Sequence, residues 1–276
     1  MNEYQVSSCD AVRTSNSNGW LMKWHIRDKW LKSPGYIYYY MWDSYSEVIA
    51  SEIARDLGIQ RHLDYKLCIL NIDGVRVIGC ESKDYKYNNY TEITLQKMLD
   101  FGYISCIKRS GYNGYNRLIA EIKSRFNVDI RDYLEDTILL DSIILNTDRN
   151  PWNMSILVDR NIQGYECKIY DSGSSLGLAG YKEGEFWEEA MYSSGEVAEP
   201  FSMYYEEQLK YIRNNRIYKG ELKETNKLLI FIENNLMNYN NKYNIQNTLN
   251  KNQLYYVRDL IIKRYNSVIK NKAWIC

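Results

Sequence analysis

The sequence predicts an α+β fold of two lobes, with a small N-terminal lobe of strands and one helix and a larger, mainly helical C-terminal lobe. Its 276 residues, 45% of them apolar, are enough for two lobes that each hold a core. A strand-turn-strand pattern surrounds Asp73-Gly74, and apolar residues recur at helical spacing in much of the chain after residue 91. We place the division after residue 81, so that the lobes span 1–81 and 82–276.

The N-terminal lobe is expected to begin with a loop and two strands. Residues 7–19 are rich in Ser, Asn, Thr and Gly, which favour loops over regular structure. Two tryptophan-containing runs follow, from Trp20 to Ile26 and from Lys29 to Lys32. Their alternating character indicates strands.

A helix is predicted from about residue 45 to residue 57, in the segment YSEVIASEIARDLGI. Ser44 or Ser46 is a suitable N-cap, and Gly58 is a suitable end. The apolar residues that recur at helical spacing are Val48, Ile49, Ile53 and Leu57.

The remaining elements are a hairpin in the first lobe and several helices in the second. Two strand-like runs, 65–72 and 75–80, flank Asp73-Gly74, a dipeptide typical of two-residue hairpin turns. The most apolar helical segment of the second lobe is DYLEDTILLDSIIL, from Asp132 to Leu145. Further helical patterning occurs in 200–214, 221–238 and 251–270.

The composition argues against several classes of protein. Lys plus Arg and Asp plus Glu both total 35, so a formal charge of zero gives no electrostatic basis for a nucleic-acid or membrane partner. No window approaches the roughly 20 apolar residues of a spanning helix, and the first residues lack the apolar stretch of a secretion signal. The six cysteines show no C-x-x-C pair, and there are only two histidines. We therefore expect a cytoplasmic protein with reduced, mostly buried thiols and no zinc site.

The stretch LNTDRNPWNMSILVDRNIQGYECKIYDSG, residues 145–173, carries the chemistry. MSILV and YECKIY are β-prone runs around a turn-like DRNIQG, so residues 154–170 predict a hairpin. A hairpin returns its ends to one edge of a sheet, which brings Asn153 and Asp171 together, with Asp148 in the preceding loop. Carboxylate and amide oxygens, completed by substrate phosphates, suit Mg²⁺.

The order and spacing of these residues agree with phosphoryl transfer. In protein kinases an Asp precedes a metal-binding Asn by five positions, and a metal-binding Asp follows a hairpin. Asn153 follows Asp148 by five positions here, and Asp171 follows it by 23. The His-Arg before the Asp, a G-x-G-x-x-G loop and an A-P-E sequence are all missing. The sequence therefore does not predict an ordinary eukaryotic-type kinase.

NTDRNPWN followed by IYDSGSSLG resembles the N-T-D-R-H-x-x-N and F-D-x-G-x-S pattern of the HipA-like bacterial serine/threonine kinases. WLKS and YSEVIASEIARDLGI also resemble small-lobe segments of short members of that group. The resemblance covers about residues 20–80 and 135–180 and is most specific over 145–176. One departure is Asn150, where the family pattern has His. The resemblance implies a protein-kinase-like fold.

The resemblance also implies a role for each matching residue. Asp148 would orient and deprotonate the acceptor hydroxyl, while Asn153 and Asp171 would hold Mg²⁺. Lys32 would contact the α- and β-phosphates of ATP, and Glu47 would pair with Lys32.

Some of these assignments have rivals in the sequence. Lys23 competes with Lys32 for the phosphate role, and Glu52 competes with Glu47. Arg149 is more simply a loop brace, because no step of the transfer requires it. The resemblance further implies that the 7–19 segment covers the phosphates and carries a serine or threonine that the enzyme phosphorylates on itself. The candidates are Ser7, Ser8, Thr14, Ser15 and Ser17.

The resemblance therefore implies an ATP- and Mg²⁺-dependent serine/threonine protein kinase, with a protein as its phosphate acceptor. The chain is expected to be a stand-alone catalytic core, short of the N-terminal subdomain of full-length HipA toxins, and an antitoxin or regulatory partner would restrain it. Two alternatives stay open. One is a kinase of the same fold that acts on lipid head groups or small molecules, and the other is a pseudokinase that only binds a partner.

Overall fold

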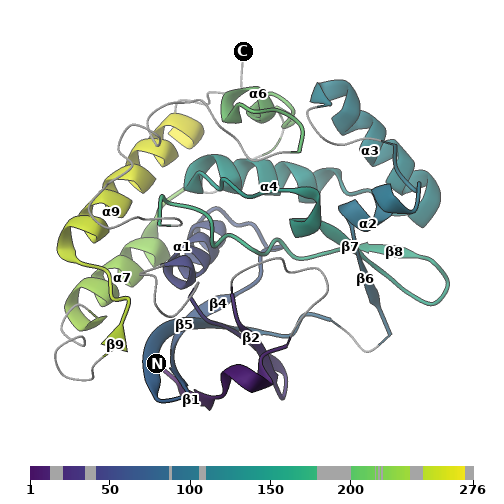
Figure 1. Cartoon of the computed structure of the whole chain (residues 1–276). Coiled ribbons are helices and arrows are strands. Elements are labelled where there is room, and N and C mark those ends of the chain that lie inside the picture. Colours follow the sequence, from purple (N-terminus) through teal and green to yellow (C-terminus); the bar gives the residue numbers. More distant parts are fainter. Residues whose placement is uncertain are drawn as a thin grey trace.

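The computed structural model describes residues 1–12, 21–34, 42–86, 89–105, 110–178, 200–214, 216, 218, 220–236 and 245–270. It confirms the predicted α+β fold with a β-rich first lobe and a helical second lobe. In Figure 1 a curled sheet lies at the bottom and the helices surround α4 above it. The division after residue 81 stays a prediction.

The N-terminal sheet is built mainly from the first 83 residues. Its strand order is β1-β4-β5-β3-β2, with β1 parallel to β4 and the other pairs antiparallel. The strands are β1 (Glu3–Val6), β2 (Lys23–Ile26), β3 (Lys29–Lys32), β4 (Tyr65–Ile72) and β5 (Val75–Lys83). The four strands after β1 match the predicted runs, whereas β1 was not predicted.

The hairpin between β4 and β5 turns at Asp73-Gly74, as predicted. Both residues have positive φ, 49° and 91°, which is the backbone conformation that a two-residue turn between antiparallel strands requires. This turn fixes the register of the two longest strands in the sheet.

Helix α1 (Asp43–Asp56) packs on the sheet against β4 and β5. It ends as expected, because Gly58 has a φ of 76° just beyond the last turn. Neither Ser44 nor Ser46 caps its start, because Trp42 occupies the N-cap position. Ser46 Oγ instead donates to the backbone oxygen of Ser175, 2.9 Å away, and so joins the helix to the second lobe.

A second, smaller sheet lies in the C-terminal lobe. It has the order β6-β7-β8, from β6 (Thr91–Thr94), β7 (Ser155–Val158) and β8 (Gly164–Glu166). β7 and β8 form the predicted hairpin, although β8 ends sooner than expected. The expectation of helical structure from residue 91 was wrong for the first four residues. The segment TEIT forms β6 and pairs with β7 before the first helix of the second lobe begins.

Helix α4 (Arg131–Ile144) is the centre of the C-terminal lobe. The predicted helix is present, and its residues 133–144 are all buried, including the acidic Glu135, Asp136 and Asp141. The segment 200–214 holds only the short α6, which is less helix than expected. The other helices are α2 (Leu95–Asp100), α3 (Gly111–Phe126), α6 (Tyr205–Leu209), α7 (Lys223–Phe231) and α9 (Lys251–Tyr265). Short 3-10 or π turns lie at η1 (Ser8–Asp10), η2 (Pro151–Asn153), η3 (Ile232–Leu236) and η4 (Asn266–Lys270).

The last part of the chain returns to the first lobe. The Asp56 carboxylate accepts from the backbone N–H groups of Glu224 and Thr225, both at 2.9 Å, and so caps α7. β9 (Ile245–Gln246) adds in parallel to β5 (Figure 1). Helix α1 is therefore held by the sheet, by α7 and by α4. No helix in the part of the chain that the structure describes is long and apolar enough to cross a bilayer.

Candidate active site

Lys32 lies at the end of β3 and contacts carboxylates from two distant segments. Its Nζ is 2.5 Å from Oε1 of Glu47 in α1 and 3.2 Å from Oδ1 of Asp171, which follows β8. The lysine side chain is 10% exposed and that of Glu47 only 2%. These ion pairs join a strand and a helix of the first lobe to a loop of the second.

The cluster holds its charges despite burial. Burial disfavours the Asp171 carboxylate, but Lys32 and then Lys23 outweigh it and keep the pKa of Asp171 well below its ordinary value. Burial also disfavours the Lys32 ammonium, yet Asp171 and Glu47 hold its pKa well above the ordinary value. Lys32 and Asp171 are therefore both ionised at neutral pH.

The structure separates the two rival glutamates but not the two rival lysines. Oε2 of Glu47 accepts from the backbone N–H of Ser172 at 2.9 Å, so this glutamate also positions the loop after Asp171. Glu52 pairs with Arg55 on its own helix instead. The structure does not exclude Lys23 from the phosphate role, because Lys23 and Lys32 lie directly opposite each other in the register of β2 and β3.

The loop after β8 approaches α1 closely. Asp171 has a φ of 61°, in the left-handed region that Asp tolerates better than most residues other than Gly. A Cβ at Gly173 would lie 3.2 Å from Cβ of Asp43, at the start of α1. A side chain at position 173 would therefore require the loop or Asp43 to shift by a few tenths of an ångström.

The second half of the site is the loop between α4 and β7. Asn153 Nδ2 donates to the backbone oxygen of Asp148 at 2.6 Å and lies 3.3 Å from its Oδ2. Asn150 Nδ2 donates to Oδ1 of Asp148 at 2.7 Å, and its own Oδ1 accepts from the backbone N–H of Trp152 at 2.9 Å. Asn150 thus caps η2 and holds the Asp148 carboxylate at the same time. Burial is the main cause that raises the pKa of Asp148 above its ordinary value.

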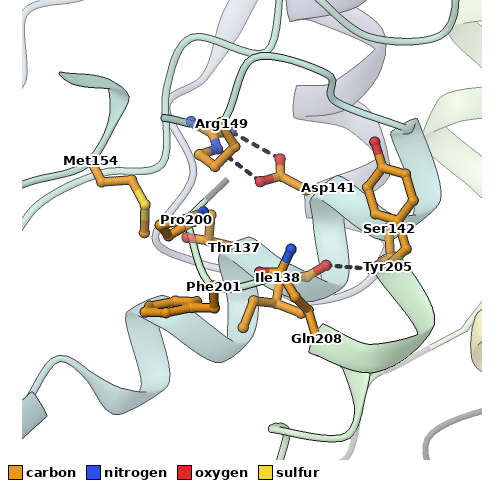
Figure 2. Close-up of a pocket in the computed structure, with 10 residues that line it drawn as sticks. All are labelled: Thr137, Ile138, Asp141, Ser142, Arg149, Met154, Pro200, Phe201, Tyr205 and Gln208. Atoms are coloured by element: carbon orange, nitrogen blue, oxygen red, sulfur yellow. Dashed lines mark hydrogen bonds and ion pairs between the residues drawn. The ribbon is translucent and has the colours of Figure 1, made fainter. Parts of the chain in front are cut away.

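Arg149 anchors this loop to the buried helix beneath it. Its Nε and Nη2 donate to the two oxygens of Asp141 in α4, at 2.8 Å and 3.0 Å (Figure 2). Nη1 donates to the backbone oxygens of Asn153 and Tyr170, at 3.2 Å and 2.5 Å. Because Tyr170 precedes Asp171, Arg149 holds both halves of the site. These contacts agree with the simpler interpretation of Arg149 as a residue that braces the loop.

Two hollows in the described part of the chain are lined by none of Lys32, Glu47, Asp148, Asn153 and Asp171. The cavity in Figure 2, about 10 Å³, lies between α4 and α6 below the Arg149–Asp141 pair. It has room for about one water molecule and not for a nucleotide. A larger hollow of about 450 Å³ lies beside the Asp73-Gly74 turn and has Ser7 and His25 among its lining residues.

The oxygen atoms near Asp148 suit a magnesium ion. The amide nitrogen of Asn153 is used by Asp148, which leaves its oxygen without a hydrogen bond in the described part of the chain. One oxygen of Asp171 faces Lys32 and the other is unused there. Among the described residues no three His, Cys, Asp or Glu side chains gather to hold a metal. An ion here would take a carboxylate, an amide and oxygens from a ligand, a donor set that fits Mg²⁺.

Of the candidate phosphorylation sites, the structure describes Ser7 and Ser8. Ser7 caps η1, and the backbone N–H of Ser8 donates to Oδ2 of Asp73 at 3.0 Å. Both lie against the turn between β4 and β5. The other three, Thr14, Ser15 and Ser17, fall outside the described residues, as does most of the 7–19 segment.

Among solved structures, the chain is similar to the crystal structure of the Helicobacter pylori proinflammatory kinase CtkA, with a TM-score of 0.62. The match covers 98% of this chain and 97% of that chain at 14% identity, so it establishes the fold alone. This chain has a protein-kinase-like fold. The structure of hydra Fam20 with sugar covers 91% of this chain and 83% of that chain at 13% identity, but its TM-score of 0.40 adds nothing to this result. No protein-family model and no curated protein matches the chain.

The side chains of the site are of the types that phosphoryl transfer requires. Protein kinases pair a strand lysine with a helix glutamate, hold metal with a loop aspartate and asparagine, and place a further aspartate beside the acceptor. The structure brings residues of these five types together, as an ion-paired cluster and a hydrogen-bonded loop whose Asp148 interacts electrostatically with Asp171. They are Lys32, Glu47, Asp148, Asn153 and Asp171.

Three supporting contacts were missed from the sequence: Asp141 as the partner of Arg149, the Ser172 N–H as the partner of Glu47, and the hydrogen bond from Asn150 to Asp148. The first joins a helix to the loop that follows it, and the second joins residues 125 positions apart; neither contact has a local sequence signal. The position of Lys23 could have been predicted from the sequence. Lys23 and Lys32 are equally far from the two-residue turn at Arg27-Asp28, so a hairpin places them opposite each other.

Proposed function

We propose that this protein is an ATP- and Mg²⁺-dependent kinase of HipA type that transfers the γ-phosphate to serine or threonine on a protein. The observation that carries the proposal is the buried cluster of Lys32, Glu47 and Asp171 next to the hydrogen-bonded pair of Asp148 and Asn153. The protein-kinase-like fold supports the general class. The HipA type is supported by the motifs NTDRNPWN and YDSGSSLG.

Each side chain has a task in the proposed transfer. Lys32 would neutralise charge on the α- and β-phosphates, and Glu47 would keep its ammonium in place. Asp171 and Asn153 would hold Mg²⁺, which supplies charge neutralisation on the phosphates when bound. Asp148 would accept the proton of the acceptor hydroxyl as its oxygen bonds to the γ-phosphorus and the bond to the ADP oxygen breaks.

The raised pKa of Asp148 supports its role as base. A carboxylate whose pKa lies closer to neutrality is a better proton acceptor than an ordinary one. Its two hydrogen bonds, from Asn150 and Asn153, orient the carboxylate without neutralising it. The remaining features of the proposal are a cytoplasmic location, phosphorylation of its own 7–19 segment, and restraint by an antitoxin or regulatory partner.

The acceptor class is tested with γ-labelled ATP, Mg²⁺ and three acceptor pools: bacterial lysate proteins, phospholipid vesicles and small metabolites. The proposal predicts label in proteins, recovered as phosphoserine or phosphothreonine. Label found only in lipid or in metabolites would support kinase activity but contradict the proposed protein acceptor. Folded protein that binds no ATP with Mg²⁺ would overturn the proposal entirely.

Phosphorylation of the chain by itself is tested separately by intact-mass spectrometry after incubation with Mg²⁺-ATP. A gain of one phosphate, mapped to a fragment that contains residues 7–19, is the expected result. Phosphate mapped to another segment, or none while protein acceptors are labelled, would remove this feature and leave the kinase.

A further inference from the structure

The hairpin of β2 and β3 presents two matched pairs of side chains on one face. Lys23 lies opposite Lys32, and His25 lies opposite Trp30. Side chains that face each other across antiparallel strands share a face of the sheet, as do residues two apart along a strand. The lysine pair and the aromatic pair are therefore neighbours on the face of Lys32, separated by about 7 Å. Trp24 and Leu31 point the other way, into the smaller buried cluster of the N-terminal lobe.

The two lysines differ in their partners. Lys32 has two carboxylates within 3.2 Å, whereas the Lys23 ammonium has no ion-pair partner among the residues that the structure describes. Burial and then the charge of Lys32 lower the pKa of Lys23, and the more distant carboxylates of Asp171 and Glu47 offset this only in part. An anion beside the pair would compensate the Lys23 charge.

The aromatic pair lies toward the connection between the lobes. The rings of His25 and Trp30 have centroids 4.7 Å apart. His25 Nε2 is 2.9 Å from Oδ2 of Asp84, which directly follows β5 where the chain leaves the first lobe. Trp30 is partly exposed and belongs to neither buried cluster of the described chain. A held, accessible indole of this kind suits stacking of a planar base.

We infer that this face binds both ends of a nucleoside triphosphate, with Lys23 as a second phosphate-binding cation beside Lys32 and Trp30 as the platform on which the base stacks. The inference rests on the proposed function and deepens it. Lys23 and Lys32 are then not rivals. Lys32 is ion-paired with Glu47 and Asp171, while Lys23 contributes a charge that forms no ion pair among the described residues and can pair with the ligand. His25, held by Asp84, keeps the indole in place.

Binding of two probes, ATP with Mg²⁺ and adenosine, separates the two contacts in calorimetry. For Lys23→Gln we expect the Kd for ATP to rise about tenfold and the Kd for adenosine to change less than about twofold, since only ATP carries phosphates. Lys23→Arg should stay close to the wild type. For Trp30→Ala we expect both Kd values to rise about tenfold, because both probes carry the base. Trp30→Phe should recover most of this loss.

Lys66→Gln is the matched control, because Lys66 is an exposed lysine of β4 in the same sheet. It should bind both probes as the wild type does, and thermal melting checks that every variant is folded. Equal loss of ATP and adenosine binding in Lys23→Gln would overturn the phosphate role, as would no loss. Unchanged adenosine binding in Trp30→Ala would overturn the platform. A folded wild type that binds neither probe overturns the proposed function itself, and this inference with it.

Discussion

The two halves of the candidate site are built in different ways. Asp148, Asn150 and Asn153 lie within six consecutive residues and hold one another through short-range hydrogen bonds. Lys32, Glu47 and Asp171 come from three segments, and up to 139 positions separate the members that touch. The first half forms from turn chemistry, and the second exists only when both lobes are packed together. Arg149 connects them, because it contacts the backbone before Asp171 and the loop of Asp148.

Removal of the connection should have the largest effect on the fold. Asp141→Asn leaves the buried Arg149 guanidinium without a compensating charge, which should lower the free energy of unfolding by about 3 kcal/mol. Chemical denaturation measures it. Asp259→Asn, which alters the exposed Asp259–Lys263 pair of α9, is the control and should cost less than about 1 kcal/mol. Equal effects of the two substitutions would show that Arg149 does not connect the halves.

The long-range half is tested on the two glutamates of α1. Glu47→Gln removes the charge beside Lys32 and weakens the hydrogen bond from Ser172, so kcat/KM for ATP should fall roughly 10- to 100-fold. Glu52→Gln, five residues further along the same helix, alters the ion pair with Arg55 and should change kcat/KM less than about twofold. Comparable losses in both variants would mean that the Lys32–Glu47 pair has no special part in ATP use.

The local half is tested at Asn150, with a smaller expected effect. Asn150→Ala removes both the cap of η2 and the donor to Asp148, and should lower kcat about tenfold and stability by about 1 kcal/mol. Asn150→Asp keeps the cap acceptor, so stability should be retained, while kcat falls because a like charge faces Asp148. If Asn150→Asp were as active as the wild type, the hydrogen bond to Asp148 would have no role in catalysis.

The pH dependence should report on the same loop. Because burial raises the pKa of Asp148, the carboxylate takes up its proton at a higher pH than an ordinary aspartate. A base must be unprotonated, so kcat/KM should be constant near neutrality and fall as the pH drops through this raised value. Values of kcat/KM measured from neutral to mildly acidic pH give the acid limb of the pH–rate profile. An acid limb at or below the ordinary aspartate range would contradict the assignment.

The difference between the halves also explains what the sequence could predict. The spacing of Asp148, Asn153 and Asp171 identified the loop and hairpin, because turn residues and alternating strands act locally. Lys32 and Glu47 were chosen on resemblance, and each had a rival in the sequence. The packing of α1 on the sheet separates Glu47 from Glu52, whereas the strand register places Lys23 beside Lys32. Asp141 had no signal, since an acidic residue in an apolar helix does not reveal its partner. β6 and β9 were missed because strands of four and two residues depend on the neighbours with which they pair.

The central claim is that both halves form one phosphotransfer site, and ADP formation by the wild type and by Asp148→Asn tests it most directly. Both proteins are incubated with Mg²⁺-ATP and lysate proteins as acceptor, and ATP binding is measured on the same samples. We expect the wild type to form ADP and the variant to form it at a rate lower by roughly 10²- to 10⁴-fold while still binding ATP. Equal ADP formation by the two proteins, or a folded wild type that neither binds nor cleaves ATP, would contradict the claim.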